Sequence, residues 1–102
     1  MNVNHKVITC FIPMGNGHAL LEALVGEKGI TTVYLHHARG AGAKGATRRK
    51  GLARLTEKDV LTVTVPEERA EEIFAFIYER GQVNRPHGGL MFMQSPMLFM
   101  PF

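Results

Sequence analysis

The residues most able to do chemistry lie in the middle of the chain, in the segment 39–58. Its glycines would let backbone N–H groups approach an anion closely, and its basic side chains outnumber a single acid, Glu57. The glycines are Gly40, Gly42, Gly45 and Gly51, and the basic residues are Arg39, Lys44, Arg48, Arg49, Lys50, Arg54 and Lys58. A long basic loop at the centre of a small chain is typical of a functional segment, so we expect an anionic partner here.

The spacing of this segment does not match the common phosphate-binding motifs. A Walker loop ends in Gly-Lys-Ser/Thr, and residues 44–47 read Lys-Gly-Ala-Thr instead. A dinucleotide fingerprint needs a helix to begin at the glycines, and none is predicted there. The run 48–50 is a weak signal for nucleic acid because no aromatic residue lies in the loop to stack on bases. An exposed loop with solvated charges remains the alternative.

The histidines do not predict a metal cluster. His36 and His37 are adjacent on a predicted strand, so their side chains point to opposite faces, and we expect one packed and one exposed imidazole. His5, His18 and His87 are scattered along the chain. We therefore assign no metal site from the sequence.

No catalytic residues are assigned either. Cys10 lies in an apolar run and is predicted to be inert packing, and no nucleophile lies beside a recognisable base. The methionines near the end of the chain could be thioether copper ligands, but core or subunit contacts are the favoured interpretation. They are Met91, Met93, Met97 and Met100.

The composition is that of one small globular domain covering residues 1–102, with 45% hydrophobic residues and a formal net charge of +3. One cysteine cannot form an intramolecular disulfide and fits a reducing compartment. No leader-like start and no apolar run of about 20 residues is visible, so we expect a cytoplasmic protein that is not embedded in a membrane.

The elements that must position the central segment can be predicted from hydrophobic periodicity. The predicted strands are 5–13, 30–38, 60–65 and 90–94, and the predicted helices are 19–28 and 66–80. The first strand is apolar almost throughout, which favours a central strand buried on both faces. Asn16 is a candidate cap for the first helix, and Gly29 and Gly81 are predicted to end the two helices.

The side chains predicted to form the core follow the same periodicity. They are Leu20, Leu21, Leu24 and Val25 on the first helix, Leu61, Val63 and Val65 on the third strand, and Ala70, Ile73, Phe74 and Ile77 on the second helix. The order βαββαβ predicts an α+β, ferredoxin-like sandwich, with a four-stranded antiparallel sheet and both helices on one face. The other face needs a cover, which self-association could supply.

The chain resembles the PII nitrogen-regulatory signal-transduction superfamily. The run 29–31, leading through a strand to Arg-Gly-Ala-Gly-Ala-Lys-Gly at 39–45, resembles the strand that enters the family's long T-loop. The run 63–68 resembles the strand and the Pro-acidic helix start that follow, and 85–92 resembles the glycine-rich B-loop and last strand. The resemblance thus identifies 39–58 as T-loop-like and 82–89 as B-loop-like, followed by an apolar tail, 95–102.

The resemblance implies a non-enzymatic regulator that forms a homotrimer. It would bind ATP, ADP or AMP in clefts between subunits and act through its loop on a partner such as a membrane transporter or a metabolic enzyme. The implied effector-binding residues are Thr31, Tyr34, Gly40, Ala41, Gly42, Ala43, Lys44, Thr64, Arg85, His87, Gly88 and Gly89. The implied partner-binding residues are Arg48, Arg49, Lys50 and Arg54.

Two of the departures from the family pattern lie at positions that contact phosphates. Ala43 stands where the family typically has an arginine, and Leu90 where it has a lysine, both of which contact phosphates. Either Arg39, Lys44 or Arg85 takes over this role, or the cleft binds another small anion or nothing. The resemblance therefore implies a degenerate PII-like protein.

Two other functions remain open at this point. A metal-binding module of the same fold, similar to the divalent-cation-tolerance proteins, would use His36, His37 or His87. A ferredoxin-like nucleic-acid-binding protein would use the basic loop, but nucleic acid is the less favoured partner because the expected aromatic pair on the sheet is missing.

Overall fold

The computed structural model describes residues 4–41, 55–86 and 88–95. The elements follow in the order β1 (His5–Pro13), α1 (Gly17–Lys28), β2 (Val33–Ala41), β3 (Leu55–Pro66), α3 (Glu67–Arg80) and β4 (Leu90–Gln94). The predicted order of strands and helices is therefore confirmed.

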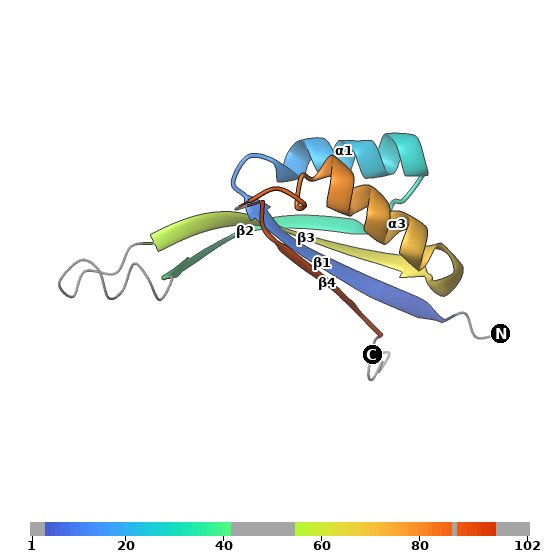
Figure 1. Cartoon of the computed structure of the whole chain (residues 1–102). Coiled ribbons are helices and arrows are strands. Elements are labelled where there is room, and N and C mark those ends of the chain that lie inside the picture. Colours follow the sequence, from blue (N-terminus) through green and yellow to red (C-terminus); the bar gives the residue numbers. More distant parts are fainter. Residues whose placement is uncertain (1–3, 42–54, 87, 96–102) are drawn as a thin grey trace, which may run out of the picture.

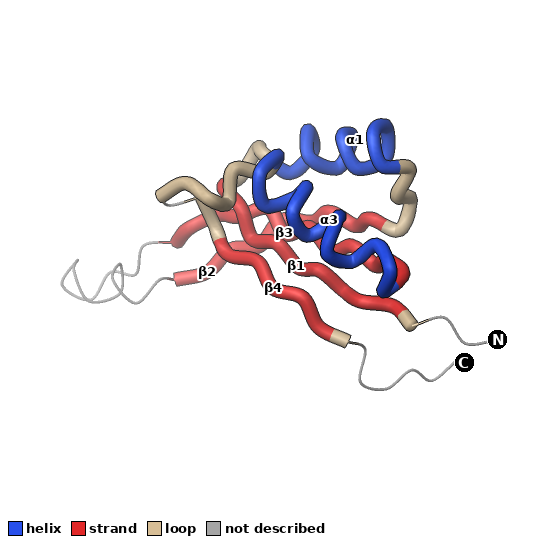
Figure 2. Tube along the Cα trace, turned by 45° about the vertical axis from the view of Figure 1, so that its right-hand side comes forward, coloured by secondary structure: helices blue, strands red, loops and turns tan. Residues whose placement is uncertain are grey.

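The strands form one antiparallel sheet in the order β2-β3-β1-β4. Strand β1 is central, as its apolar sequence predicts, because it pairs with β3 on one side and with β4 on the other. Both helices lie on the same face of the sheet (Figures 1 and 2). This is the predicted ferredoxin-like α+β fold.

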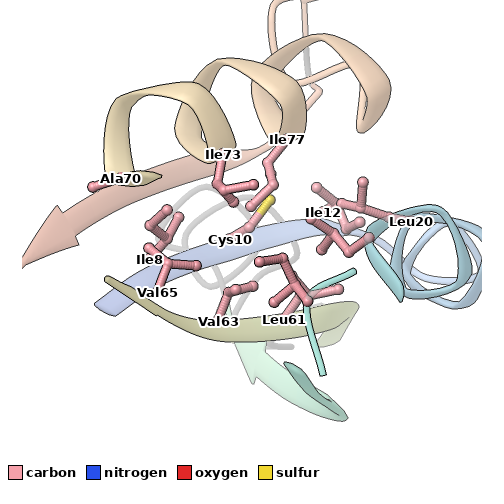
Figure 3. Packing of buried hydrophobic residues seen from close by; sticks show 12 residues of the cluster. Ile8, Cys10, Ile12, Leu20, Leu61, Val63, Val65, Ala70, Ile73 and Ile77 are labelled. Atoms are coloured by element: carbon pink, nitrogen blue, oxygen red, sulfur yellow. The ribbon is translucent and has the colours of Figure 1, made fainter. Parts of the chain in front are cut away.

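The core lies between the helices and that face of the sheet (Figure 3). Alternate residues of β1 and β3 point into it, because neighbouring side chains of a strand point to opposite faces. The buried cluster comprises Ile8, Cys10, Ile12, Leu20, Leu24, Ile30, Leu61, Val63, Val65, Ala70, Ile73 and Ile77. Burying one large aliphatic side chain contributes about 1.5–3 kcal/mol, so this cluster supplies most of the stability.

The helices bury most of the stripes that their sequences predict. Phe74 and Leu21 pack at the margin of the core, but Val25 is 43% exposed, so its prediction as a core residue is wrong. Helix α1 ends at Gly29, whose φ of 68° is in the left-handed region that favours glycine. Helix α3 carries acids in its first turn and ends at Gly81 as predicted.

The hairpin formed by β2 and β3 is longer than predicted. Its register runs from Val33 opposite Val63 to Ala41 opposite Leu55. Both ends of the segment predicted as loop, 39–58, are therefore paired strand. Cross-strand hydrogen bonds outweigh the low strand propensity of Gly40, which is a contribution that local sequence patterns do not contain. Strand β2 also begins at Val33, three residues later than predicted.

Among the residues that the structure describes, no helix lies over the second face of the sheet (Figure 1). The expectation that β1 is buried on both faces is wrong within one chain, because Val7, Thr9 and Phe11 remain half-buried there. Phe92 on β4 is 40% exposed, and its ring centroid lies 6.4 Å from that of Phe11. We call this surface the open face. It also carries Tyr34, which is 66% exposed, and Leu90, which is 61% exposed.

Candidate functional site

One end of the sheet gathers the segments that the sequence marks for function. Strand β1 ends at Pro13 and helix α1 begins at Gly17, while β3 and β4 begin nearby in the paired register. The β2–β3 hairpin projects from the same end and leads to the segment 42–54 (Figure 1). We call this the loop end of the sheet.

Asp59 of β3 is the polar centre of the loop end. Its residue surface is 1% exposed, although it carries a carboxylate. Oδ2 accepts hydrogen bonds from the backbone N–H groups of Gly15, at 3.0 Å, and Gly17, at 2.8 Å. Oδ1 lies 2.6 Å from Nδ1 of His37 on β2. One carboxylate therefore connects β2, β3 and the turn between β1 and α1.

Asp59 takes over the capping role that the sequence suggests for Asn16. The Asn16 side chain makes no capping hydrogen bond, so that expectation is wrong. A free N–H at a helix start needs an acceptor, and a carboxylate also complements the positive end of the helix dipole. An acceptor 42 residues away in sequence satisfies Gly17 instead.

The environment of Asp59 lowers its pKa below the ordinary value. Burial, the largest influence, raises the pKa because it disfavours the charged form. The hydrogen bonds from Gly17 N–H, from His37 and from Gly15 N–H stabilise the carboxylate and together outweigh burial. The side chain is therefore ionised at neutral pH.

Gly17 fits this arrangement because it has no side chain. A Cβ at that position would lie 2.8 Å from Oδ2 of Asp59 and would also collide with the side chain of Leu35. The glycine therefore lets helix α1 begin directly against the carboxylate.

The adjacent histidines point to opposite faces, as predicted. His37 is opposite Asp59 in the register, on the face with the helices, and His36 is opposite Val60 on the open face. The expectation that one of them is packed is wrong, because both are exposed; the His37 side chain is 63% exposed even with its hydrogen bond. Their opposite orientation prevents them from binding one ion together. No group of three potential His, Cys, Asp or Glu ligands occurs among the described residues.

The B-loop-like segment also reaches the loop end. A side chain at Gly88 would collide with the backbone carbonyl oxygens of Gln82 and Arg85. The N–H of Gly88 donates a hydrogen bond to the backbone carbonyl oxygen of Arg85 at 2.8 Å. Gly89 has a φ of 129°, and a side chain there would collide with the carbonyl of Phe11. Both glycines thus shape a tight turn against β1. Arg85 is exposed in this turn.

The predicted effector-binding residues fall into two separated groups. Tyr34 and Thr64 lie toward the opposite end of the sheet. There the N–H of Thr64 donates a hydrogen bond to the backbone carbonyl oxygen of Thr32 at 3.1 Å. Gly40 and Ala41 lie on the hairpin at the loop end. Gly40 lies six positions after Tyr34 along β2, and six steps of about 3.3 Å each give a separation of about 20 Å. One chain does not bring the groups together, so a site that uses both needs a second copy.

Several predicted residues lie outside the described part of the chain. For the effector site they are Gly42, Ala43, Lys44 and His87, and for the partner-binding loop they are Arg48, Arg49, Lys50 and Arg54. Thr31 is described and is exposed just before β2. The assignment of all these residues to binding stays a prediction.

Two further features of the described residues bear on possible chemistry, namely the thiol of Cys10 and a pocket beside Arg80. Burial raises the pKa of the Cys10 thiol to about 11, which agrees with the predicted inert packing role. A pocket of about 280 Å³ lies where α1 begins and α3 ends, and Arg80 is among its lining residues. The Arg80 guanidinium is already paired with the carboxylate of Glu27, at 2.6 and 2.7 Å.

The chain matches known proteins in its fold and not in its sequence. No family model and no curated protein matches the sequence. Among solved structures, the ATP complex of B. subtilis GlnK matches with a TM-score of 0.70 at 14% identity, over 94% of this chain and 84% of that one. Arabidopsis thaliana PII bound to citrate matches with a TM-score of 0.68 at 16% identity, over 90% of this chain and 77% of that one. The chain has a PII-like fold.

The PII-like fold confirms the resemblance inferred from the sequence at the level of architecture. Asp59 is the polar residue that sequence reasoning missed in this PII-like chain. Two local signals could have suggested it: an acid directly before an apolar strand, and a turn at 15–17 whose helix start lacks a strong local cap.

None of the helices in the described ranges is long and apolar enough to cross a membrane.

Proposed function

We propose that this chain is the subunit of a non-enzymatic regulator. It binds a small anionic effector, an adenine nucleotide or another small anion, in clefts between the subunits of a homotrimer. Effector binding changes the conformation of the segment 39–58, which then acts on a partner such as a transporter or a metabolic enzyme. Such coupling requires the effector to favour one conformation of the segment over another.

The observation that carries this proposal is the match in fold to the ATP complex of GlnK, which extends over most of both chains. A second match is to a PII structure that holds citrate, so the same fold accommodates anions of two kinds. The basic character of the segment 39–58 supports an anionic ligand in this chain as well.

The placement of the described residues supports a cleft between copies. Tyr34 and Gly40 are too far apart on one strand to contact one small effector. The open face carries Phe11, Phe92 and Leu90, which would be covered if copies packed through it. An assembly would therefore both bury apolar surface and complete the site.

Isothermal titration calorimetry on a sample of measured mass tests the proposal. The ligands are ATP, ADP, AMP and citrate, each with and without Mg²⁺. We expect saturable binding of at least one of them by an oligomer. Absence of heat with all of them would contradict the proposed effector class, and binding by a monomer would contradict the cleft between subunits.

A further inference from the structure

The ring of His37 is held by a buried partner, although most of the side chain is exposed. Nδ1 lies 2.6 Å from Oδ1 of Asp59, and the His37 side chain is 63% exposed. The other oxygen of the carboxylate is held by the N–H groups of Gly15 and Gly17. A carboxylate that is fixed in this way orients the exposed ring in advance, which lowers the entropy lost when the ring meets a reactant.

The pairing distinguishes the two ring nitrogens of His37. Because an ionised carboxylate accepts hydrogen bonds and does not donate them, Nδ1 carries the proton in this contact. Nε2 of the neutral ring therefore keeps its lone pair, and it makes no hydrogen bond to any of the described residues. Such a nitrogen, on an exposed ring, is a nucleophile.

Asp59 also stabilises the ring that results when Nε2 forms a bond. The ring then keeps the proton on Nδ1 and becomes positively charged, as the imidazolium of a Ser-His-Asp triad does. The ionised carboxylate of Asp59 balances this charge from 2.6 Å. Its own charge is shared with the N–H groups of Gly15 and Gly17, so it repels an incoming anion less than a free carboxylate does.

Two other histidines show what is particular to His37. His36 is the residue before it, but lies opposite Val60 on the open face. His18 engages its Nε2 with Glu22 at 3.1 Å, and both of these side chains are mostly exposed. In the part of the chain that the structure describes, neither of these two rings is paired with a buried carboxylate.

We propose that Nε2 of His37, on the ring oriented by Asp59, accepts a phosphoryl group from a phosphoramidate, which is a donor that carries the group on nitrogen. The lone pair of Nε2 forms a bond to phosphorus, the P–N bond of the protonated donor breaks, and the amine leaves with the electron pair of that bond. No further reactant is needed, because the ring keeps its Nδ1 proton and Asp59 balances the charge.

This modification adds about two negative charges at the loop end, on the strand that leads into the β2–β3 hairpin. The inference goes beyond the proposed function, since it needs neither a nucleotide nor a cleft between copies, and calorimetry with nucleotides tests that function separately. Asp59 is a positioning residue here because it acts on the phosphoryl group only through the ring of His37.

The test treats the full chain with phosphoramidate at about pH 8, where ordinary histidines are neutral, and follows the reaction by mass spectrometry of intact protein and peptides. We expect His37 to react roughly tenfold faster than His36, as for one hydrogen bond to a charged group. His37→Gln should remove the fast reaction, and the matched control His36→Gln should keep it. Equal rates at the two residues, or a fast reaction that survives in His37→Gln, would overturn the proposal.

The same reaction in urea that unfolds the wild type needs no variant to fold. The advantage of His37 over His36 should disappear there, because the contact with Asp59 depends on the pairing of β2 with β3. An advantage that persists in the unfolded chain would come from the local sequence and would overturn the role of the fold.

Asp59→Asn tests the positioning role by the ring atom that carries the phosphoryl group. The wild type should carry it on Nε2 alone, as read by NMR of the chain with ¹⁵N-labelled histidine. The variant should react more slowly and on both ring nitrogens, because a neutral amide holds Nδ1 less strongly than a carboxylate. A folded variant, verified by thermal melting, that still reacts only on Nε2 would contradict the positioning role.

Discussion

The two faces of the sheet differ in whether one chain completes them. On the face with the helices, Ile8, Leu61 and Val63 are fully buried against α1 and α3. On the open face, Tyr34 and Phe92 remain largely or partly exposed, although they lie on paired strands of the same sheet. The difference shows that this chain makes its own core on one face, and that among the described residues the second apolar surface stays exposed, which is the surface that the proposed assembly would cover.

The largest expected effect on stability is for a residue on the face of the sheet that the helices cover. Ile73→Ala would leave a cavity under α3 and lower the free energy of unfolding by about 2–5 kcal/mol, as measured by urea denaturation. The control Val25→Ala removes a side chain that is 43% exposed and should change it by no more than about 0.5 kcal/mol. Equal losses in both variants would contradict the assignment of the core to this face.

The next effect belongs to the loop end. Asp59→Asn replaces a buried carboxylate that holds three groups and should lower the free energy of unfolding by about 1–3 kcal/mol at neutral pH. Because folding lowers the pKa of Asp59, its stabilisation is complete above the pKa of unfolded aspartate, about 4, and is lost as pH falls toward the lower folded pKa.

Urea denaturation at several pH values checks this prediction. Below about pH 4, the gap between wild type and Asp59→Asn should narrow. A gap that stays constant down to the most acidic pH at which the protein remains folded would show that the charge of Asp59 does not stabilise the fold.

The smallest effect on the fold of one chain is expected on the open face. Phe92→Thr keeps a β-prone residue on β4 but removes an aromatic ring that is 40% exposed and that contacts Phe11. We expect this variant to keep the circular dichroism spectrum of the wild type and to have a lower mass in light scattering. The control Gln94→Thr, on the same face and strand, should keep the wild-type mass. An unchanged mass for Phe92→Thr would remove this residue from the interface.

Local patterns were sufficient to predict the elements of the covered face. The stripe of Ala70, Ile73 and Ile77 specifies which side of α3 is buried, and the alternation through Leu61 and Val63 does the same for β3. Both depend on neighbours in sequence, so the ferredoxin-like order could be inferred without coordinates.

The loop end could not be predicted in the same way because its contacts are distant in sequence. Asp59 reaches Gly17 across 42 residues and His37 across 22 residues. Whether those groups meet depends on the register of β2 against β3, which alternation alone does not determine. The extension of the hairpin to Ala41 has the same origin, since its strand partners are in the other half of the chain.

The central claim is that the open face is completed by other copies of this chain. Light scattering of the wild-type protein during size-exclusion chromatography tests it most directly. The account predicts a mass of about three times the 11.3 kDa of one chain. A mass of 11.3 kDa across the accessible concentration range would contradict it.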